Sequence, residues 1–274
     1  MAERVLDVEG LGVTYGRGRS AKVVLRDIDV HIDAGETLGL VGESGSGKTT
    51  LGRAVLGLAP VGAGRIAFLG EDITHAGPRA RRRIARDLQV VFQDPYTSLN
   101  PAMTVRDILT EPLVAQGVPG KEARARVREL LDRVAMPSNA LDRYSREFSG
   151  GQRQRVAIAR ALALDPKLVV CDEPVSALDL STQLRVLDLL LEIQQRTGVA
   201  YLFISHDLAV VRHVSHRVAV MSEGEIVETG RAAQVTSHPN HPYTQRLWAA
   251  NLVADPAAQA ERRALRRALA RTEQ

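Results

Sequence analysis

Apolar residues along the chain follow two patterns, short continuous runs and stretches with helical spacing. The runs predict strands at VVLRDIDVHI (23–32), TLGLVG (37–42), RIAFLG (65–70), LQVVFQ (88–93), KLVVCDEP (167–174) and AYLFISH (200–206). Between the second and third runs, TTLGRAVLGLA predicts a helix whose apolar face carries Leu51, Ala54, Val55 and Leu58. Strands that alternate with helices indicate an α/β fold with a parallel sheet.

The stretch from Asp94 to about Phe148 has a different, helical pattern. MTVRDILTEPLVAQ and EARARVRELLDRVAM both predict helices, so we expect a helical insertion in the sheet. Later, RVAVMSEGEIVETG (217–230) predicts a hairpin that turns at Glu223-Gly224. From Asp255 the Ala, Arg and Glu content predicts a solvated helix or a frayed end.

Composition restricts the class of protein. The 274 residues are 45% apolar, which is enough for a core, and the single cysteine, Cys171, excludes an internal disulfide framework or a cysteine-built metal cluster. No apolar run approaches the ~18 residues that span a bilayer, and MAERVLDVEG lacks the apolar stretch of a signal peptide. We therefore expect a cytoplasmic protein, or one attached to a membrane through partners. The net charge of +4 is modest, and arginines gather at 79–86 and 262–271 rather than on one predicted face, which does not favour nucleic-acid binding.

The sequence GESGSGKT (42–49) fits the phosphate-binding pattern G-x-x-x-x-G-K-[ST], between a predicted strand and a predicted helix. Its glycines let backbone N–H groups surround phosphates, Lys48 adds a positive charge, and the Thr49 hydroxyl can coordinate Mg²⁺. The alternative is a glycine turn without a ligand. The predicted binding residues are Gly42, Glu43, Ser44, Gly45, Ser46, Gly47, Lys48, Thr49 and Thr50.

Two acids follow the apolar strand LVVCDEP, at the edge where open α/β sheets bind ligands. Asp172 is expected to hold Mg²⁺, and Glu173 to polarise an attacking water as the catalytic residue. The alternative is that both acids cap the next helix. Cys171, which precedes the two acids within the predicted strand, is interpreted as a small buried hydrophobe rather than a redox thiol.

Three further residues are candidates by position. Gln93 and His206 end predicted strands, so Gln93 is expected to contact Mg²⁺ or the attacking water, and His206 the γ-phosphate; each has a capping role as its alternative. Tyr15 is a candidate for stacking on adenine, or an ordinary edge-strand tyrosine.

A second glycine-bearing helix start lies in FSGGQRQRVAIARAL (148–162). A helix N-terminus has unpaired N–H groups and a positive dipole end, which suit phosphate. The predicted residues are Ser149, Gly150, Gly151 and Gln152; a tight helix start without a ligand is the alternative.

Together GESGSGKTT, VVFQDP, FSGGQRQR, LVVCDEPVSALD and FISHD resemble the ordered motifs of ABC-transporter ATPase subunits over nearly the whole chain, with Phe148 in place of the usual leucine. The resemblance implies a P-loop NTPase core with a RecA-like parallel sheet and helices, an N-terminal antiparallel β-subdomain and an inserted α-helical subdomain. It divides one ABC ATPase domain, 1–274, into a core with β-subdomain (1–93 and 159–235), a helical subdomain with the signature motif (94–158) and a C-terminal tail (236–274). It also implies ATP and Mg²⁺ as cofactors.

The same resemblance answers why two phosphate-binding elements exist. In that family two ATPase subunits face each other head to tail, and each ATP lies between one subunit's phosphate loop and the other's Ser-Gly-Gly helix. Residues 149–152 are thus expected to serve a nucleotide bound by a second subunit, a paralogue or another copy. Asp179 of SALD lies where the family's loop crosses between subunits.

FQDPYTSLNPAMTV (92–105) and HPNHPYTQRLWAA (238–250) resemble the peptide and nickel importer subfamily. This implies two multi-span permease subunits as partners, an extracytoplasmic substrate-binding protein acting indirectly, no nucleic acid, and a place on the cytoplasmic face of the inner membrane. His238 and His241 are interpreted as loop-packing residues, with a metal pair as the alternative. Arginines 79–86 are interpreted as a solvated face, with contact to lipid headgroups or a permease loop as the alternative.

The expected function is ATP binding and hydrolysis that powers uptake of di- or oligopeptides, or of nickel or metal chelates. A soluble ABC ATPase acting on nucleic acid or ribosomes is the alternative; such proteins tend to have coiled-coil arms or two ATPase halves, and neither pattern occurs here. A GTPase is disfavoured because no Asn-Lys-x-Asp stretch is present.

Overall fold

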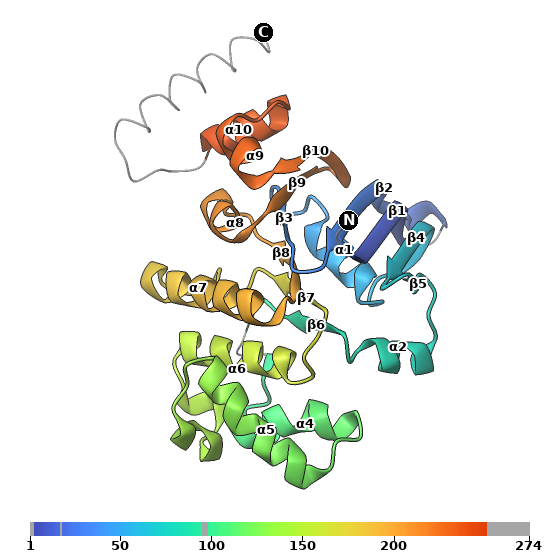
Figure 1. Cartoon of the computed structure of the whole chain (residues 1–274). Coiled ribbons are helices and arrows are strands. Elements are labelled where there is room, and N and C mark those ends of the chain that lie inside the picture. The colour runs from blue at the N-terminus through green and yellow to red at the C-terminus, as the bar shows by residue number, and fades with distance from the viewer. Residues whose placement is uncertain (1–2, 17, 95–97, 251–274) are drawn as a thin grey trace.

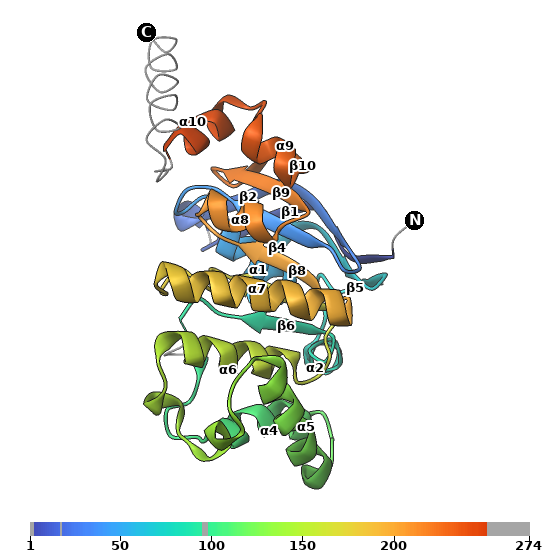
Figure 2. The same cartoon turned by 60° about the vertical axis from the view of Figure 1, so that its left-hand side comes forward.

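The computed structural model describes residues 3–16, 18–94 and 98–250, which form two sheets with helices around them (Figure 1). Helices α4 to α6 lie at one end of the molecule, and α9 and α10 lie at the other (Figures 1 and 2). Within these described ranges, no helix has the length and apolar character needed to cross a bilayer. The tail from Asp255 and arginines 262–271 lie outside the described residues.

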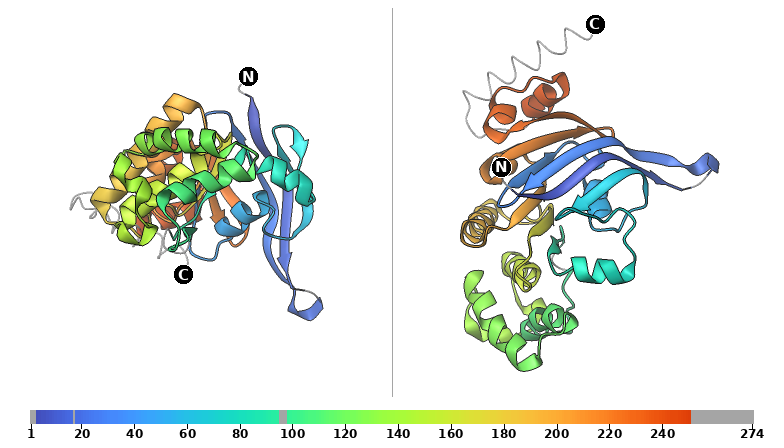
Figure 3. Two further views of the ribbon diagram at one scale, coloured as in Figure 1. Left: turned by 90° about the horizontal axis from the view of Figure 1, so that it is seen from below. Right: turned by 45° about the vertical axis from the view of Figure 1, so that its right-hand side comes forward.

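The first sheet is antiparallel and has the strand order β2-β1-β4-β5. Its strands are β1 (Arg4–Tyr15), β2 (Lys22–Asp33), β4 (Val61–Phe68) and β5 (Glu71–Asp72). Alternate side chains of β1, including Leu6, Val8, Leu11 and Val13, are buried against the core. The last residues of β1 and the first residues of β2 project beyond the body of the molecule (Figure 3). This sheet corresponds to the antiparallel β-subdomain that the family resemblance implies.

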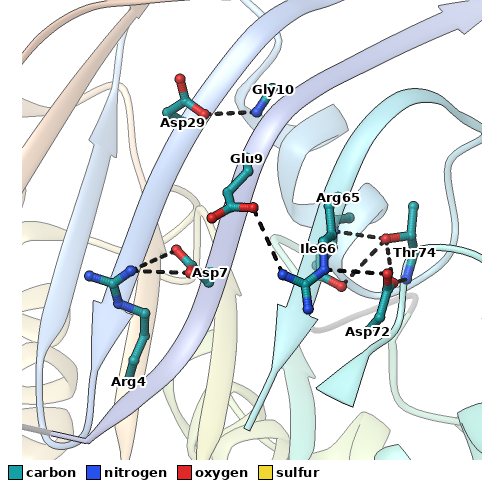
Figure 4. A network of polar contacts seen from close by, with 9 residues as sticks. All are labelled: Arg4, Asp7, Glu9, Gly10, Asp29, Arg65, Ile66, Asp72 and Thr74. Atoms are coloured by element: carbon teal, nitrogen blue, oxygen red, sulfur yellow. Dashed lines mark hydrogen bonds and ion pairs between the residues drawn. The ribbon is translucent and has the colours of Figure 1, made fainter. Parts of the chain in front are cut away.

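Polar groups on neighbouring strands of this sheet pair with one another (Figure 4). Arg65 lies between Glu9 and Asp72, at 3.8 and 3.4 Å, and Asp29 accepts a hydrogen bond of 2.7 Å from the Gly10 N–H. The Thr74 hydroxyl donates to Asp72, and this bond is the largest cause of a lowered Asp72 pKa. Because these groups are exposed, the network adds little to stability.

The second sheet carries the chemistry and has the order β10-β9-β3-β8-β7-β6, parallel except for the β9–β10 pair. Its strands are β3 (Thr37–Val41), β6 (Leu88–Val91), β7 (Leu168–Asp172), β8 (Ala200–Ile204), β9 (Arg217–Ser222) and β10 (Glu225–Arg231). Strands β3 and β8 are buried along their full length, as expected for a sheet covered on both faces. The hairpin turn at Glu223 and Gly224 is confirmed, and both residues have positive φ, as a two-residue hairpin loop requires.

Nine α-helices are assigned within the described residues. They are α1 (Lys48–Val55), α2 (Pro78–Ile84), α4 (Val105–Ala115), α5 (Gly120–Arg133), α6 (Gly150–Leu162), α7 (Leu180–Thr197), α8 (Leu208–Val214), α9 (Ala232–Ser237) and α10 (Pro242–Ala250). The helical insertion packs around fully buried Leu109, Val127, Leu131 and Val156. Its predicted limit at residue 158 falls inside α6, which continues to Leu162.

Two residues, Leu58 and Arg81, are not placed as the local pattern predicts. Leu58 does not belong to the buried face of α1, because the helix ends at Val55 and Leu58 is 62% exposed. The helix stops there because Gly57 adopts a positive φ of 74°. The arginines of 79–86 are exposed, as predicted for a solvated face, except Arg81. Arg81 is half-buried and donates hydrogen bonds to the Val55 and Ile73 carbonyls, at 3.2 and 2.6 Å.

Candidate active site

The loop of residues 42–47 joins the carboxyl end of β3 to the start of α1. Two of its glycines, Gly42 and Gly45, show different reasons why the loop needs this residue. At Gly42, with φ of 156°, an added Cβ would lie 2.1 Å from the Met221 carbonyl oxygen. At Gly45, with φ of 83°, an added Cβ would meet nothing within 4 Å, so only the left-handed backbone conformation excludes other residues.

This difference gives a stability prediction. Gly42→Ala forces a methyl group against the Met221 carbonyl oxygen, and we expect it to lower the free energy of unfolding by about 3 kcal/mol. Gly45→Ala, its matched control, has only the left-handed conformation to accommodate, at about 1–2 kcal/mol. Urea unfolding of the two variants measures both values, and equal losses would contradict the contact with Met221.

Lys48 is buried at the first turn of α1, with 5% exposure. Its Nζ donates to the Gly42 and Glu43 carbonyl oxygens, at 2.8 Å each. Burial lowers the pKa of Lys48, and the negative charges of Glu173, Asp172 and Glu43 offset part of that effect. A desolvated cation whose hydrogen-bond acceptors are neutral favours an anion beside it.

The Ser46 hydroxyl also favours an anion at this loop. It is buried and has no hydrogen-bond partner within the described part of the chain. Buried polar atoms normally find a partner, and a phosphate oxygen is an acceptor for this hydroxyl. The loop therefore fits a polyphosphate.

Thr49 and Asp172 meet on the other side of the loop. The Thr49 hydroxyl donates to Asp172 Oδ1 at 3.1 Å. Burial raises the pKa of Asp172, and the bond from Thr49 opposes that rise. A hydroxyl and a carboxylate are oxygen ligands of the kind that Mg²⁺ prefers, with phosphate oxygens and waters completing its shell. These residues fit the predicted Mg²⁺ site.

Glu173, Gln93 and His206 come together at the same sheet edge. Gln93 Nε2 donates to Glu173 Oε2 at 3.1 Å, and His206 Nδ1 lies 3.2 Å from Glu173 Oε1. The parallel register explains this, because β6, β7 and β8 are neighbours and all three residues follow their carboxyl ends. Glu173 has a φ of 47°, a strained conformation that residues at functional sites adopt more often than others.

A cleft of about 580 Å³ collects these groups. Its lining residues are Val24, Ser44, Gly45, Gly47, Lys48, Thr49, Thr50, Gln93, Glu173 and His206. A separate cavity of about 650 Å³ lies among Val5, Pro166 and Val199 and shares no lining residue with it. The smaller cleft is the candidate active site, because the convergent polar groups line it. None of its lining residues comes from 149–152.

The Ser-Gly-Gly segment forms a capped N-terminus of α6 within this chain. Ser149 Oγ accepts from the Gln152 N–H at 3.4 Å, and Gln152 Oε1 accepts from the Ser149 N–H at 3.0 Å, which is a capping box. Gly151 allows α6 to approach α7, because an added Cβ would lie 2.2 Å from Thr182 Cγ2. This glycine thus has a packing role as well as its predicted one.

Asp179 caps the neighbouring helix. Its carboxylate accepts from the Thr182 N–H at 3.0 Å and from the Ser181 hydroxyl at 2.7 Å. These hydrogen bonds lower the pKa of Asp179. Since Thr182 also contacts the Gly151 position, the SALD segment and the start of α6 lie side by side.

A family model described as ABC transporter matches residues 25–176, more than half of the chain. The chain belongs to the ABC transporter family. That range includes the phosphate loop, the helical insertion and both strand-end acids.

Curated relatives of this ABC chain include the glutathione import ATP-binding protein GsiA of Escherichia coli (strain K12) and of Shigella flexneri. Each is 53% identical over 232 residues, which cover 84% of this chain and 37% of the relative. The chain therefore spans less than half the length of these relatives.

Two solved structures share the fold. The ATP-binding cassette MJ0796, in a dimeric post-hydrolysis state bound to ADP and Pi, has a TM-score of 0.75 at 28% identity and covers 83% of this chain and 98% of its own. CbiO1 from Clostridium perfringens, described as part of the ABC transporter complex cbiONQ, has a TM-score of 0.77 at 29% identity and covers 86% and 92%. These likenesses confirm the predicted fold class.

Three further residues of this ABC domain, Tyr15, Val24 and Cys171, can be compared with the sequence predictions. Tyr15 ends β1, is 37% exposed and is not among the residues lining the cleft, so its stacking role stays a prediction. Val24 of β2 does line the cleft, although nothing in an ordinary strand valine signals this. Cys171 is fully buried and its pKa is raised by burial, consistent with a small core residue.

Proposed function

We propose that this chain is the ATP-binding and ATP-hydrolysing subunit of an ABC importer, which powers uptake of small peptides of the glutathione class through separate permease subunits. The observation that carries the proposal is the cleft itself. There a desolvated lysine, a hydroxyl–carboxylate pair and a hydrogen-bonded glutamate converge at the end of one parallel sheet. Membership of the ABC transporter family supports the nucleotide as ATP.

The chain's own residues divide the work. The loop N–H groups and Lys48 bind the β- and γ-phosphates, and Thr49, Asp172 and Gln93 supply oxygen ligands for Mg²⁺. Bound Mg²⁺ neutralises the charge that develops on the phosphates. Glu173 orients and polarises the attacking water, because Gln93 and His206 fix its carboxylate from both sides. His206 also lies where it can bond the γ-phosphate.

A second ATPase subunit, a paralogue or another copy, completes the site in this proposal. Residues 149–152 do not line the chain's own cleft, and Ser149 is exposed at a helix N-terminus, where the dipole favours phosphate. Asp179 lies beside this helix start and takes part in the same contact. The dimer reported for MJ0796 supports the arrangement. ATP between the two subunits would close them, and loss of the γ-phosphate would release them.

The proposed cargo follows from the relatives. GsiA is named for glutathione import, and glutathione is a small peptide; nickel or a metal chelate is the competing cargo. With two multi-span permeases and an extracytoplasmic binding protein, the subunit would act at the cytoplasmic face of the membrane. The alternative function, a soluble ABC ATPase acting on nucleic acid or ribosomes, predicts a different set of partners.

Purification of the tagged chain from its source membranes tests the proposal. We expect multi-span membrane proteins to co-purify, and the complex in vesicles to take up labelled glutathione only with MgATP inside the compartment that the ATPase faces. Lys48→Ala should abolish that uptake because it removes the phosphate-binding cation. Uptake of labelled nickel instead would replace the cargo, and co-purification with ribosomes or DNA would contradict the importer function.

A further inference from the structure

The C-terminal HPYT segment touches the phosphate loop directly. Tyr243, in the first turn of α10, lies 200 residues from Glu43 in the sequence, yet its Oη accepts a hydrogen bond of 3.0 Å from the Glu43 N–H. The Tyr243 ring is half-buried and packs against the main apolar core together with Leu247 and Trp248. The hydroxyl is therefore delivered to the loop by a side chain whose ring is fixed by packing.

The bond acts on one particular peptide unit, the one that joins Gly42 to Glu43. Its carbonyl oxygen accepts from Lys48 Nζ at 2.8 Å, and its N–H donates to Tyr243. The two bonds hold opposite sides of the same peptide plane. Glycine has the least restricted backbone of all residue types, so the orientation of the peptide that follows Gly42 depends on such contacts. The orientation in turn determines where the Lys48 ammonium lies.

The segment before Tyr243 is anchored to the sheet. The Glu228 carboxylate on β10 accepts from the N–H groups of Asn240 and His241, at 2.8 and 3.2 Å. His241 Nδ1 accepts from the Tyr243 N–H at 3.2 Å, which gives this histidine a role at the start of α10. A continuous set of hydrogen bonds therefore runs from β10 through residues 240–243 to the phosphate loop.

We propose that Tyr243 is a positioning residue for nucleotide binding, through which the C-terminal segment sets the conformation of the phosphate loop. The inference rests on the proposed ATP-binding function. Tyr243 is not among the residues that line the cleft, so it acts through Glu43 and the loop rather than on the nucleotide. Its loss should weaken affinity for the nucleotide and leave the water-activating groups in place.

Tyr243→Phe tests this, because it removes the hydroxyl and keeps the packed ring. With the full chain, we expect the Kd for MgATP to rise about fivefold, the change that loss of one neutral hydrogen bond typically causes. The matched control is Gln245→Ala on the same helix, which removes bonds of 3.1 and 3.5 Å to the Pro239 and Asn240 carbonyls; it keeps the Glu228 anchor of that segment and the Tyr243 bond to the loop. Its Kd should equal that of the wild type.

Amide hydrogen exchange distinguishes a local change at the Glu43 amide from a general loss of stability, which would raise exchange rates throughout the fold. In Tyr243→Phe the Glu43 N–H should exchange faster, whereas amides of β3 and β8 should be unchanged. Glu228→Ala, which releases residues 240–241, should change both the Kd and the Glu43 exchange in the same direction. In the assembled ATPase the KM for ATP should rise while kcat stays near the wild-type value.

The outcomes separate this inference from the function on which it rests. Wild-type protein that binds no MgATP would overturn the proposed function. Wild-type protein that binds MgATP, with an equal Kd for Tyr243→Phe, would overturn only the role of Tyr243. An equal loss in Tyr243→Phe and Gln245→Ala would also overturn it, because the effect would then belong to the tail in general.

Discussion

Glu173→Gln should retain MgATP binding and lose hydrolysis by about 100-fold or more, the usual contribution of a general base. The substitution keeps the size of the side chain and its ability to accept the Gln93 hydrogen bond, so the cleft should keep its shape. It removes the negative charge that polarises water. It also removes repulsion between Glu173 and a polyphosphate, so affinity should be equal to or higher than that of the wild type. Closed dimers should therefore accumulate with MgATP, which size-exclusion chromatography detects.

Glu36→Gln is the matched control for this prediction. Glu36 precedes β3 at the end of the strand away from the phosphate loop, and its mostly buried carboxylate pairs with Arg217 at 3.0 Å. Neutralising it should lower stability but leave hydrolysis per folded molecule unchanged. If Glu173→Gln turned over ATP as fast as Glu36→Gln, Glu173 would have no role as the base.

The catalytic edge of the fold could be predicted from the sequence because parallel strands end at one edge. Val91 pairs with Cys171 and Asp172 with Ile204, so polar residues that follow these strands had to converge. Continuous apolar runs marked the strands, and the glycine-lysine pattern marked the loop between β3 and α1. The order of these strands therefore predicts that Gln93, Glu173 and His206 lie together, as their hydrogen bonds show.

Other features could not be predicted because they depend on contacts distant in sequence. Leu58 continues the helical spacing of α1, but Gly57 ends the helix, and Arg81, from another helix, bonds to the carbonyl of its last residue, Val55. Strand β1 gave a weak signal because glycines interrupt its apolar alternation at Gly10 and Gly12. No local pattern relates Tyr243 to Glu43, since the contact exists only after the sheet and the C-terminal helices have packed.

Ser149→Arg addresses whether two subunits share each nucleotide. Ser149 is exposed, and its side chain caps α6. Arginine there removes the cap, at a cost of about 1 kcal/mol, and places a long cation where the partner's nucleotide would contact the helix start. Hydrolysis in the assembled complex should fall by about 100-fold, as it does when a preorganised electrostatic contact is lost. Ser149→Ala loses the cap and the hydroxyl proposed to serve the partner's nucleotide but adds no cation, so its loss of hydrolysis should be smaller than that of Ser149→Arg.

A second control separates the position from the substitution itself. Ser138→Arg adds an equally long cation at another exposed site of the helical insertion. It should leave the assembled rate unchanged. A loss of activity in Ser138→Arg as large as that in Ser149→Arg would show a general effect of charge on assembly rather than a shared site.

Binding of one ATP by two subunits can be checked by measuring Ser149→Arg twice, as an isolated chain and in the complex. The isolated variant should bind MgATP with a Kd within about twofold of the wild type, because residues 149–152 do not line its own cleft. The complex that contains the variant should hydrolyse ATP about 100-fold more slowly. A complex that hydrolyses ATP at the wild-type rate, or an isolated variant that loses MgATP binding, would contradict the shared site.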